Sequence, residues 1–164
     1  MLIVTFLYGI ALAAVVYFTR PKWRRVAGSL FGGAMVGIYG IGAVVLGNEL
    51  GAWHVPISWT PLFLSLFYLA FSVSAAPIYL VTWRIERRFG WRGILMSLCV
   101  VAIIGPPRDY MYAGMFPEWM VFASGIAPVI ADAVAYIGII LIGHLVMRLV
   151  AGPSGEDRLA RQAA

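Results

Sequence analysis

Residues 20–47 read RPKWRRVAGSLFGGAMVGIYGIGAVVLG, and this stretch decides the class of fold. Its beginning holds four cations, at Arg20, Lys22, Arg24 and Arg25, and no further charged residue occurs before Glu49. A helix needs about 20 predominantly apolar residues to cross the hydrocarbon core of a bilayer. The stretch therefore predicts a membrane-spanning helix that begins at a basic end.

The rest of the chain repeats this alternation of apolar runs and short polar breaks. Hydrophobic residues make up 62% of the 164 residues, charged residues make up 12%, and the mean hydropathy is +0.91. A soluble domain is about half apolar and a quarter charged. We therefore expect an all-α integral membrane bundle of five transmembrane helices, at residues 1–19, 26–47, 62–83, 93–112 and 119–147.

The positions of the cations predict how these spans are oriented. A second basic group follows the third span, and three of the remaining four cations follow the fifth. Short loops rich in Lys and Arg face the cytoplasm. We expect an external N-terminus, a single transmembrane domain over residues 1–150 and a short polar cytoplasmic tail over 151–164. The expected location is a cytoplasmic membrane of bacterial type, with membrane lipids as partners. The first span lacks the basic start of a signal peptide, so we expect it to remain uncleaved.

Two overlapping rows of small residues run along the second span. Gly28 and Gly32 form one row, and Ser29, Gly33 and Gly37 form the other. Such rows let helix backbones approach closely where lipid supplies no hydrophobic drive for association. They predict either close packing within one subunit or the seam of a homo-oligomer or larger membrane complex.

The fourth and fifth spans carry ionisable residues inside apolar sequence. At about 1.5 Å per residue, Arg108 and Asp132 each lie about 24 Å from the inner boundary, which predicts an ion pair between neighbouring helices. Asp109 adds a second carboxylate. The sequence Gly105-Pro106-Pro107 just before these charges predicts a break in the fourth helix, because proline removes a backbone hydrogen bond.

The fifth span carries a polar face. Gly125, Pro128, Asp132 and Tyr136 lie close to one line at 100° per residue, so this face is expected to point inward, with a kink at Pro128. His144 projects away from that line and is expected at the cytoplasmic interface, hydrated or in contact with headgroups. An ionisable residue inside a span indicates a candidate functional site, and Arg108, Asp109, Asp132 and Tyr136 are the candidates for ligand binding or ion pairing.

Several classes of function are disfavoured by the sequence. The net charge of +5 comes from cations at the ends of apolar runs, so we expect no nucleic-acid partner. Cys99 is the only cysteine, and the spans contain no HExxH sequence and no pair of histidines. We therefore expect neither a metal site nor a cofactor.

Three functions stay open. The first is a non-enzymatic binder of a lipid-like or other apolar small molecule, or an accessory subunit of a membrane complex. The second is a small oligomeric transporter or channel-like protein that uses an Arg108/Asp132 site. The third is a membrane enzyme acting on a lipid or isoprenoid, with Asp109 and Asp132 as acid and base. The shape and polarity of the interior between the helices distinguish these classes.

Overall fold

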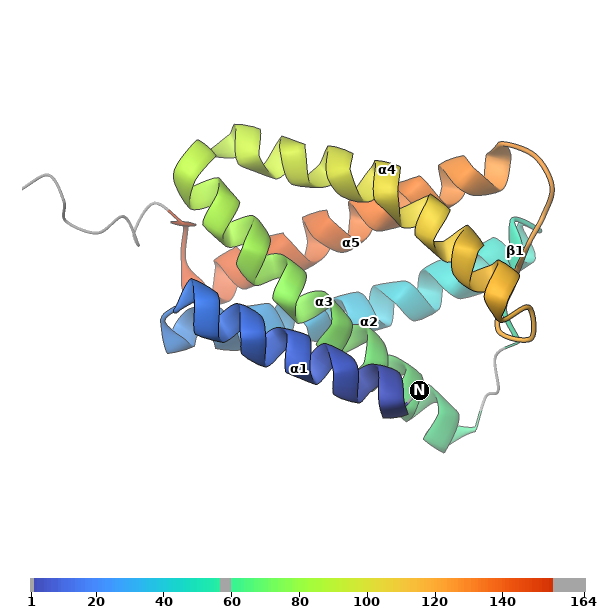
Figure 1. Ribbon diagram of the computed structural model, residues 1–164, viewed down its shortest axis with the longest axis horizontal. Coiled ribbons are helices and arrows are strands. Elements are labelled where there is room, and N and C mark those ends of the chain that lie inside the picture. The colour runs from blue at the N-terminus through green and yellow to red at the C-terminus, as the bar shows by residue number, and fades with distance from the viewer. Residues whose placement is uncertain (1, 57–59, 155–164) are drawn as a thin grey trace, which may run out of the picture.

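The computed structural model describes residues 2–56 and 60–154, with side chains from residue 5 onward. These residues form five helices and two short strands (Figure 1), which confirms the expected all-α class. Most of the expected tail, residues 155–164, lies outside the described residues. The helices are α1 (Leu2–Thr19), α2 (Trp23–Glu49), α3 (Pro61–Phe89), α4 (Trp91–Met115) and α5 (Ala127–Ala151), and the strands are β1 (Trp53–His54) and β2 (Val121–Phe122).

Four of these helices, α2 to α5, are long and apolar enough to cross a membrane. The apolar part of α1 over Thr5–Thr19 is shorter. Helix α3 lies between α1 and α4, and α2 and α5 run side by side behind it (Figure 1). The fully buried side chains of Val36, Tyr79 and Ile140 bring α2, α3 and α5 together in one core.

Helix α2 packs against α5 on one side and α3 on the other because its glycines leave room for both. A Cβ atom on Gly32 would lie 2.5 Å from the carbonyl oxygen of Gly143 in α5. A Cβ atom on Gly33 would lie 2.2 Å from the carbonyl oxygen of Ser72 in α3. The two rows of small residues therefore face neighbouring helices of the same chain.

The expected break at Gly105-Pro106-Pro107 is wrong. Helix α4 continues through both prolines to Met115, and Figure 1 shows it bending along its course rather than ending. Each proline removes one backbone donor and crowds the preceding turn, which bends a helix that is otherwise held by its remaining hydrogen bonds and by its neighbours.

The fifth helix starts later than the apolar run suggests. Residues 121–122 form β2, and α5 begins only at Ala127. Gly125 has a φ of +102°, a left-handed conformation that favours glycine, so it lies outside the helix. Pro128 falls in the first turn, where its missing N–H needs no partner, and the expected mid-helix kink is wrong.

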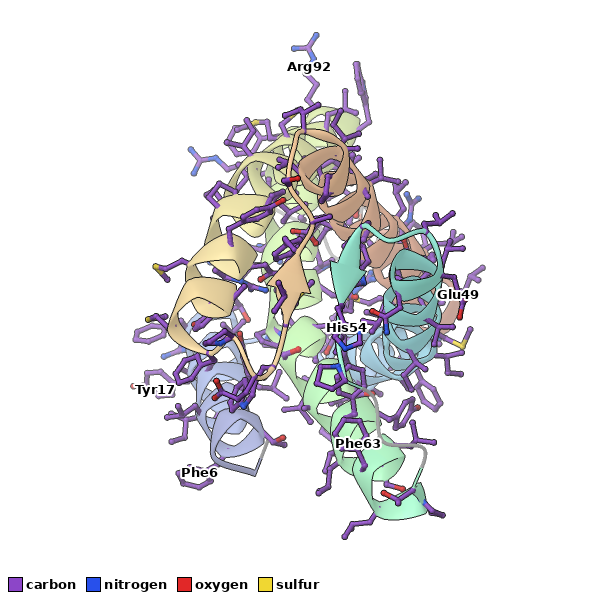
Figure 2. The ribbon with its side chains drawn as sticks, turned by 90° about the vertical axis from the view of Figure 1, so that its right-hand side faces the viewer. Phe6, Tyr17, Glu49, His54, Phe63 and Arg92 are labelled. Carbon is purple, nitrogen blue, oxygen red and sulfur yellow. The ribbon has the colours of Figure 1, made fainter. Side chains whose placement is uncertain are left out.

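Strands β1 and β2 cross one end of the bundle (Figure 2), with Trp53 opposite Phe122. The side-chain amide of Asn48 ties the chain after β1 to α2, because it accepts from the N–H of Val55 at 2.9 Å and donates to the Val55 carbonyl at 3.0 Å. The indole N–H of Trp53 donates to the carbonyl of Val44 at 3.2 Å. This end of the bundle is therefore covered by a short pair of strands.

Candidate functional site

Three polar side chains on α4 and α5 form the centre of the candidate site. The Arg108 guanidinium donates from Nε and Nη2 to Asp109 Oδ1, at 2.9 and 2.7 Å. The hydroxyl of Tyr136 donates to Asp109 Oδ2 at 2.7 Å and also accepts from Arg108. We call Arg108, Asp109, Tyr136 and the neighbouring Asp132 the outer cluster, after the orientation that the sequence predicts.

Gly105 makes this arrangement possible. A Cβ atom at this position would lie 2.3 Å from the ring of Tyr136, so the glycine gives the phenol room to reach α4. The Arg108 guanidinium in turn lies over the rings of Tyr136 and Tyr112, with 5.3 and 5.9 Å to the ring centroids. Ring faces attract a cation, so the arginine is held by charge and by π-electron density.

Asp132 does not form the ion pair expected with Arg108. Among the described residues, Arg108 pairs with Asp109 instead. Asp132 lies on the next turn of α5, close enough for its carboxylate to be repelled by Asp109 and attracted by Arg108. Asp132 is only 5% exposed, and its Oδ2 atom is buried without a hydrogen-bond partner.

The difference of one helical turn has a simple origin. Helix α5 continues to Ala151, about one turn beyond the expected end of the span, and the Arg148 guanidinium contacts Glu86 of α3. Every residue of α5 is therefore about one turn, or about 5 Å, farther from the C-terminal end of the helix than expected. This shift places Tyr136 at the level of Arg108.

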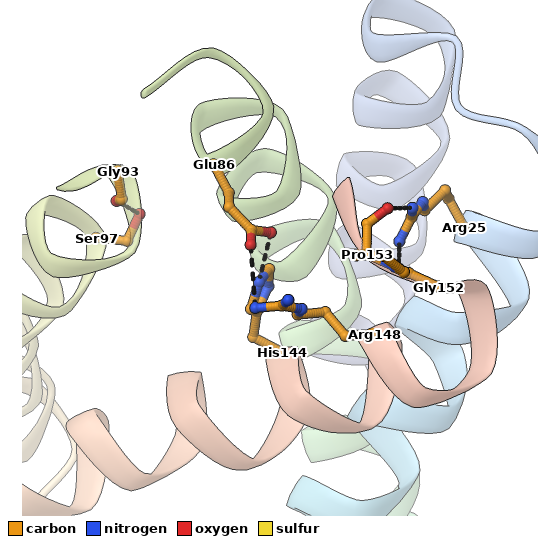
Figure 3. A network of polar contacts seen from close by, with 8 residues as sticks. All are labelled: Arg25, Glu86, Gly93, Ser97, His144, Arg148, Gly152 and Pro153. Atoms are coloured by element: carbon orange, nitrogen blue, oxygen red, sulfur yellow. Dashed lines mark hydrogen bonds and ion pairs between the residues drawn. The ribbon is translucent and has the colours of Figure 1, made fainter. Parts of the chain in front are cut away.

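A second cluster, which the sequence reasoning missed, lies at the opposite end of α5 (Figure 3). Glu86 Oε2 is 2.9 Å from His144 Nε2, and Glu86 Oε1 is 3.2 Å from Arg148 Nη1. Glu86 and His144 are both buried, so the expectation of an interfacial, hydrated His144 is wrong. We call these three residues the inner cluster, after the same predicted orientation.

Arg25 closes the same end of the bundle. Its guanidinium donates to the carbonyl oxygens of Gly152 and Pro153, the latter at 2.7 Å (Figure 3), and lies 5.6 Å from the ring centroid of Trp83. The chain that follows α5 is thereby held against the start of α2. The spacing of Tyr79, Trp83 and Glu86 could have revealed the inner cluster, because residues four and three apart share a helix face.

The two clusters are separated by an apolar layer. Val36, Tyr79 and Ile140 lie between them and are each at most 1% exposed. The hydroxyl of Tyr79 forms its hydrogen bond within this layer, because it donates to the carbonyl of Ile139 at 3.0 Å. The layer thus separates the polar side chains at one end of α5 from those at the other.

The described residues contain no group of three or more His, Cys, Asp or Glu side chains that could hold a metal ion. Comparison of the chain with protein-family models, with curated proteins and with solved structures finds no match.

Proposed function

We propose that this protein is a non-enzymatic integral membrane protein that binds an amphiphilic, lipid-like small molecule at the outer cluster. The observation that carries this proposal is a charged group that is open to its surroundings on an otherwise apolar helix. The side chain of Arg108 is 41% exposed and that of Asp109 is 22% exposed. Charged residues inside a span ordinarily face protein or water and mark a functional site.

The surface beside the outer cluster suits the apolar part of such a ligand. Ile104, Met111, Tyr112 and Met115 are all exposed, at positions four before and three, four and seven after Arg108 on α4. Residues with these spacings share one face of a helix. A molecule with a polar group at Arg108 and Asp109 can therefore lay its hydrocarbon along this face.

The other two functions receive less support. Transport needs a polar route across the membrane, whereas the layer of Val36, Tyr79 and Ile140 closes the interior between the clusters. Catalysis by two carboxylates needs them to converge on a substrate. Asp109 is instead bound by Arg108 and Tyr136, and Asp132 lies on a different turn.

The proposal includes five membrane crossings, an external N-terminus and a cytoplasmic tail, in a cytoplasmic membrane of bacterial type. Helix α1 has 18 residues and is about 27 Å long, which is close to the thickness of a hydrocarbon core of about 30 Å. The basic groups at both inner loops supply the charge bias that orients such helices.

Cysteine labelling tests this orientation. In a Cys99→Ala background, we expect Lys22→Cys and Arg87→Cys to be protected from a membrane-impermeant maleimide added to intact cells. Glu118→Cys, at an exposed residue of the opposite end, should be labelled readily. Labelling of positions 22 and 87, with protection of position 118, would reverse the proposed orientation.

Mass spectrometry after purification in native lipid tests the binding function. We expect one discrete amphiphile to accompany the wild-type protein and the Glu118→Gln control. The double variant Arg108→Gln with Asp109→Asn removes both charges without leaving either unpaired. The amount of that molecule that co-purifies with it should fall by about tenfold or more, because charge-assisted hydrogen bonds are lost. Identical small-molecule spectra for all three proteins would contradict the proposal. A stoichiometric protein partner without any small molecule would favour an accessory subunit instead.

A further inference from the structure

The charges of the outer cluster do not balance. Arg108 supplies one positive charge, whereas Asp109 and Asp132 supply two carboxylates. The guanidinium is already engaged by Asp109 and Tyr136. The unpartnered oxygen of Asp132 therefore has no cation of its own among the described residues.

A buried carboxylate in a membrane protein is costly unless a positive or hydrogen-bonding group compensates it. Only 5% of the surface of Asp132 is exposed, so little water can reach its carboxylate to compensate the charge. We infer that the polar end of the amphiphile proposed above includes a protonated primary amine, which binds Asp132, in addition to the polar group that contacts Arg108 and Asp109. This inference rests on the proposed binding function and names the chemistry of the ligand's polar end.

A second orphaned group favours an amine with several N–H bonds. The hydroxyl of Tyr110 is buried without a partner, and Tyr110 lies near enough to Asp132 for the two to interact electrostatically. The carboxylate and the hydroxyl can both accept hydrogen bonds. A primary ammonium group has three donors and can satisfy both oxygens, whereas a trimethylammonium group supplies only charge.

Aromatic side chains hold the ring of Tyr110 in place. The ring of Tyr110 stacks on Phe122 with centroids 4.0 Å apart, and Phe122 meets the edge of Trp53 at 6.1 Å. This aromatic stack connects α4 to the β1–β2 pair that covers the end of the bundle (Figure 2). The stack therefore fixes the position of Tyr110, whose hydroxyl is buried without a partner.

A matched series of alkyl compounds tests the inference on the purified protein in a neutral detergent. Four compounds share one alkyl chain and end in a primary amine, a trimethylammonium, a hydroxyl or a carboxylate, and ethanolamine serves as a short soluble amine. Affinity is measured from the rise in unfolding temperature with ligand concentration. We expect the primary amine to bind at least about tenfold more tightly than the alcohol, as one charge-assisted hydrogen bond implies.

Two variants separate the site from general membrane partitioning. Asp132→Asn keeps the shape of the side chain and should abolish the preference for the amine, whereas Glu118→Gln, at an exposed outer residue, should retain it. Competition by ethanolamine would also support the ammonium site and assign it to a soluble amine. Equal affinity for amine and alcohol, or an amine preference that survives Asp132→Asn, would overturn the inference and leave the binding function standing. Equal affinity for primary and trimethylated amines would overturn the bridge between Asp132 and Tyr110. Failure of every compound to bind would contradict the proposed function itself.

Discussion

Replacement of Glu86 by alanine is expected to destabilise the protein by about 3 kcal/mol. Glu86 contacts both His144 and Arg148, and its side chain is only 6% exposed. Removal of one member of a buried ion pair typically costs about 3 to 5 kcal/mol, because the remaining group is left uncompensated. We expect the lower end of this range because the side chain of Arg148 is 41% exposed and can find other partners.

Equilibrium unfolding in mixed micelles, followed by tryptophan fluorescence, measures this effect. Glu49→Ala is the matched control, since Glu49 is an exposed glutamate at the end of α2. The double variant Glu86→Ala with His144→Ala should cost less than the sum of the two single variants, because each change removes the same contact. A Glu86 variant as stable as the Glu49 control would show that the inner cluster contributes nothing to the fold.

Substitution of Gly33 by alanine is expected to cost about 2 to 3 kcal/mol. The added methyl group would lie 2.2 Å from the carbonyl oxygen of Ser72, and a backbone atom cannot rotate away as a side chain can. The helices α2 and α3 would have to separate, and overpacking of this kind costs about 1 to 3 kcal/mol. Gly37→Ala should cost less, because its nearest contacts are side-chain atoms of Tyr68 and Ser72.

Gly42 provides the control on the same helix, because a Cβ atom there would meet nothing within 4 Å. Gly42→Ala should be neutral or slightly stabilising, since alanine favours a helix over glycine by about 1 kcal/mol. From the sequence alone, Gly47 is expected to tolerate alanine as Gly42 does, and this expectation is wrong. Its Cβ atom would lie 1.9 Å from the ring of Trp53. Equal stability of the Gly33 and Gly42 variants would contradict the role of the glycine rows in helix packing.

The class of fold could be predicted from the sequence because the patterns that indicate it extend over many residues. Apolar runs of about 20 residues between Arg-rich breaks predict membrane helices whatever the neighbouring helices do. The ends of α4 and α5 were less accessible. Pro106 and Pro107 can end a helix or bend it, and Pro128 can kink a helix or start it. Only the packing around each proline decides between these results.

The residues of the candidate site could be predicted from the sequence, whereas the pairs that they form across the two helices could be predicted less well. Arg108, Asp109 and Tyr136 meet as polar residues of adjacent spans, but a helix changes depth by about 6 Å in four residues. The four additional residues at the C-terminal end of α5, 148–151, were enough to replace Asp132 by Tyr136 as the residue facing Arg108. Glu86 was hidden by its neighbours Arg84, Arg87 and Arg88, which make this segment resemble a hydrated loop.

Photo-crosslinking in native membranes tests the central claim, the binding of an amphiphile at the outer cluster, most directly. A diazirine amino acid is placed at Tyr112, one turn from Arg108 on the proposed binding face, and at Val134, an exposed α5 residue between Asp132 and Tyr136. We expect position 112 to capture one discrete small molecule and position 134 to capture the bulk lipids. That specific adduct should disappear when Arg108→Gln and Asp109→Asn are combined. The same mixture of bulk lipids at both positions, unchanged by the double variant, would contradict the claim.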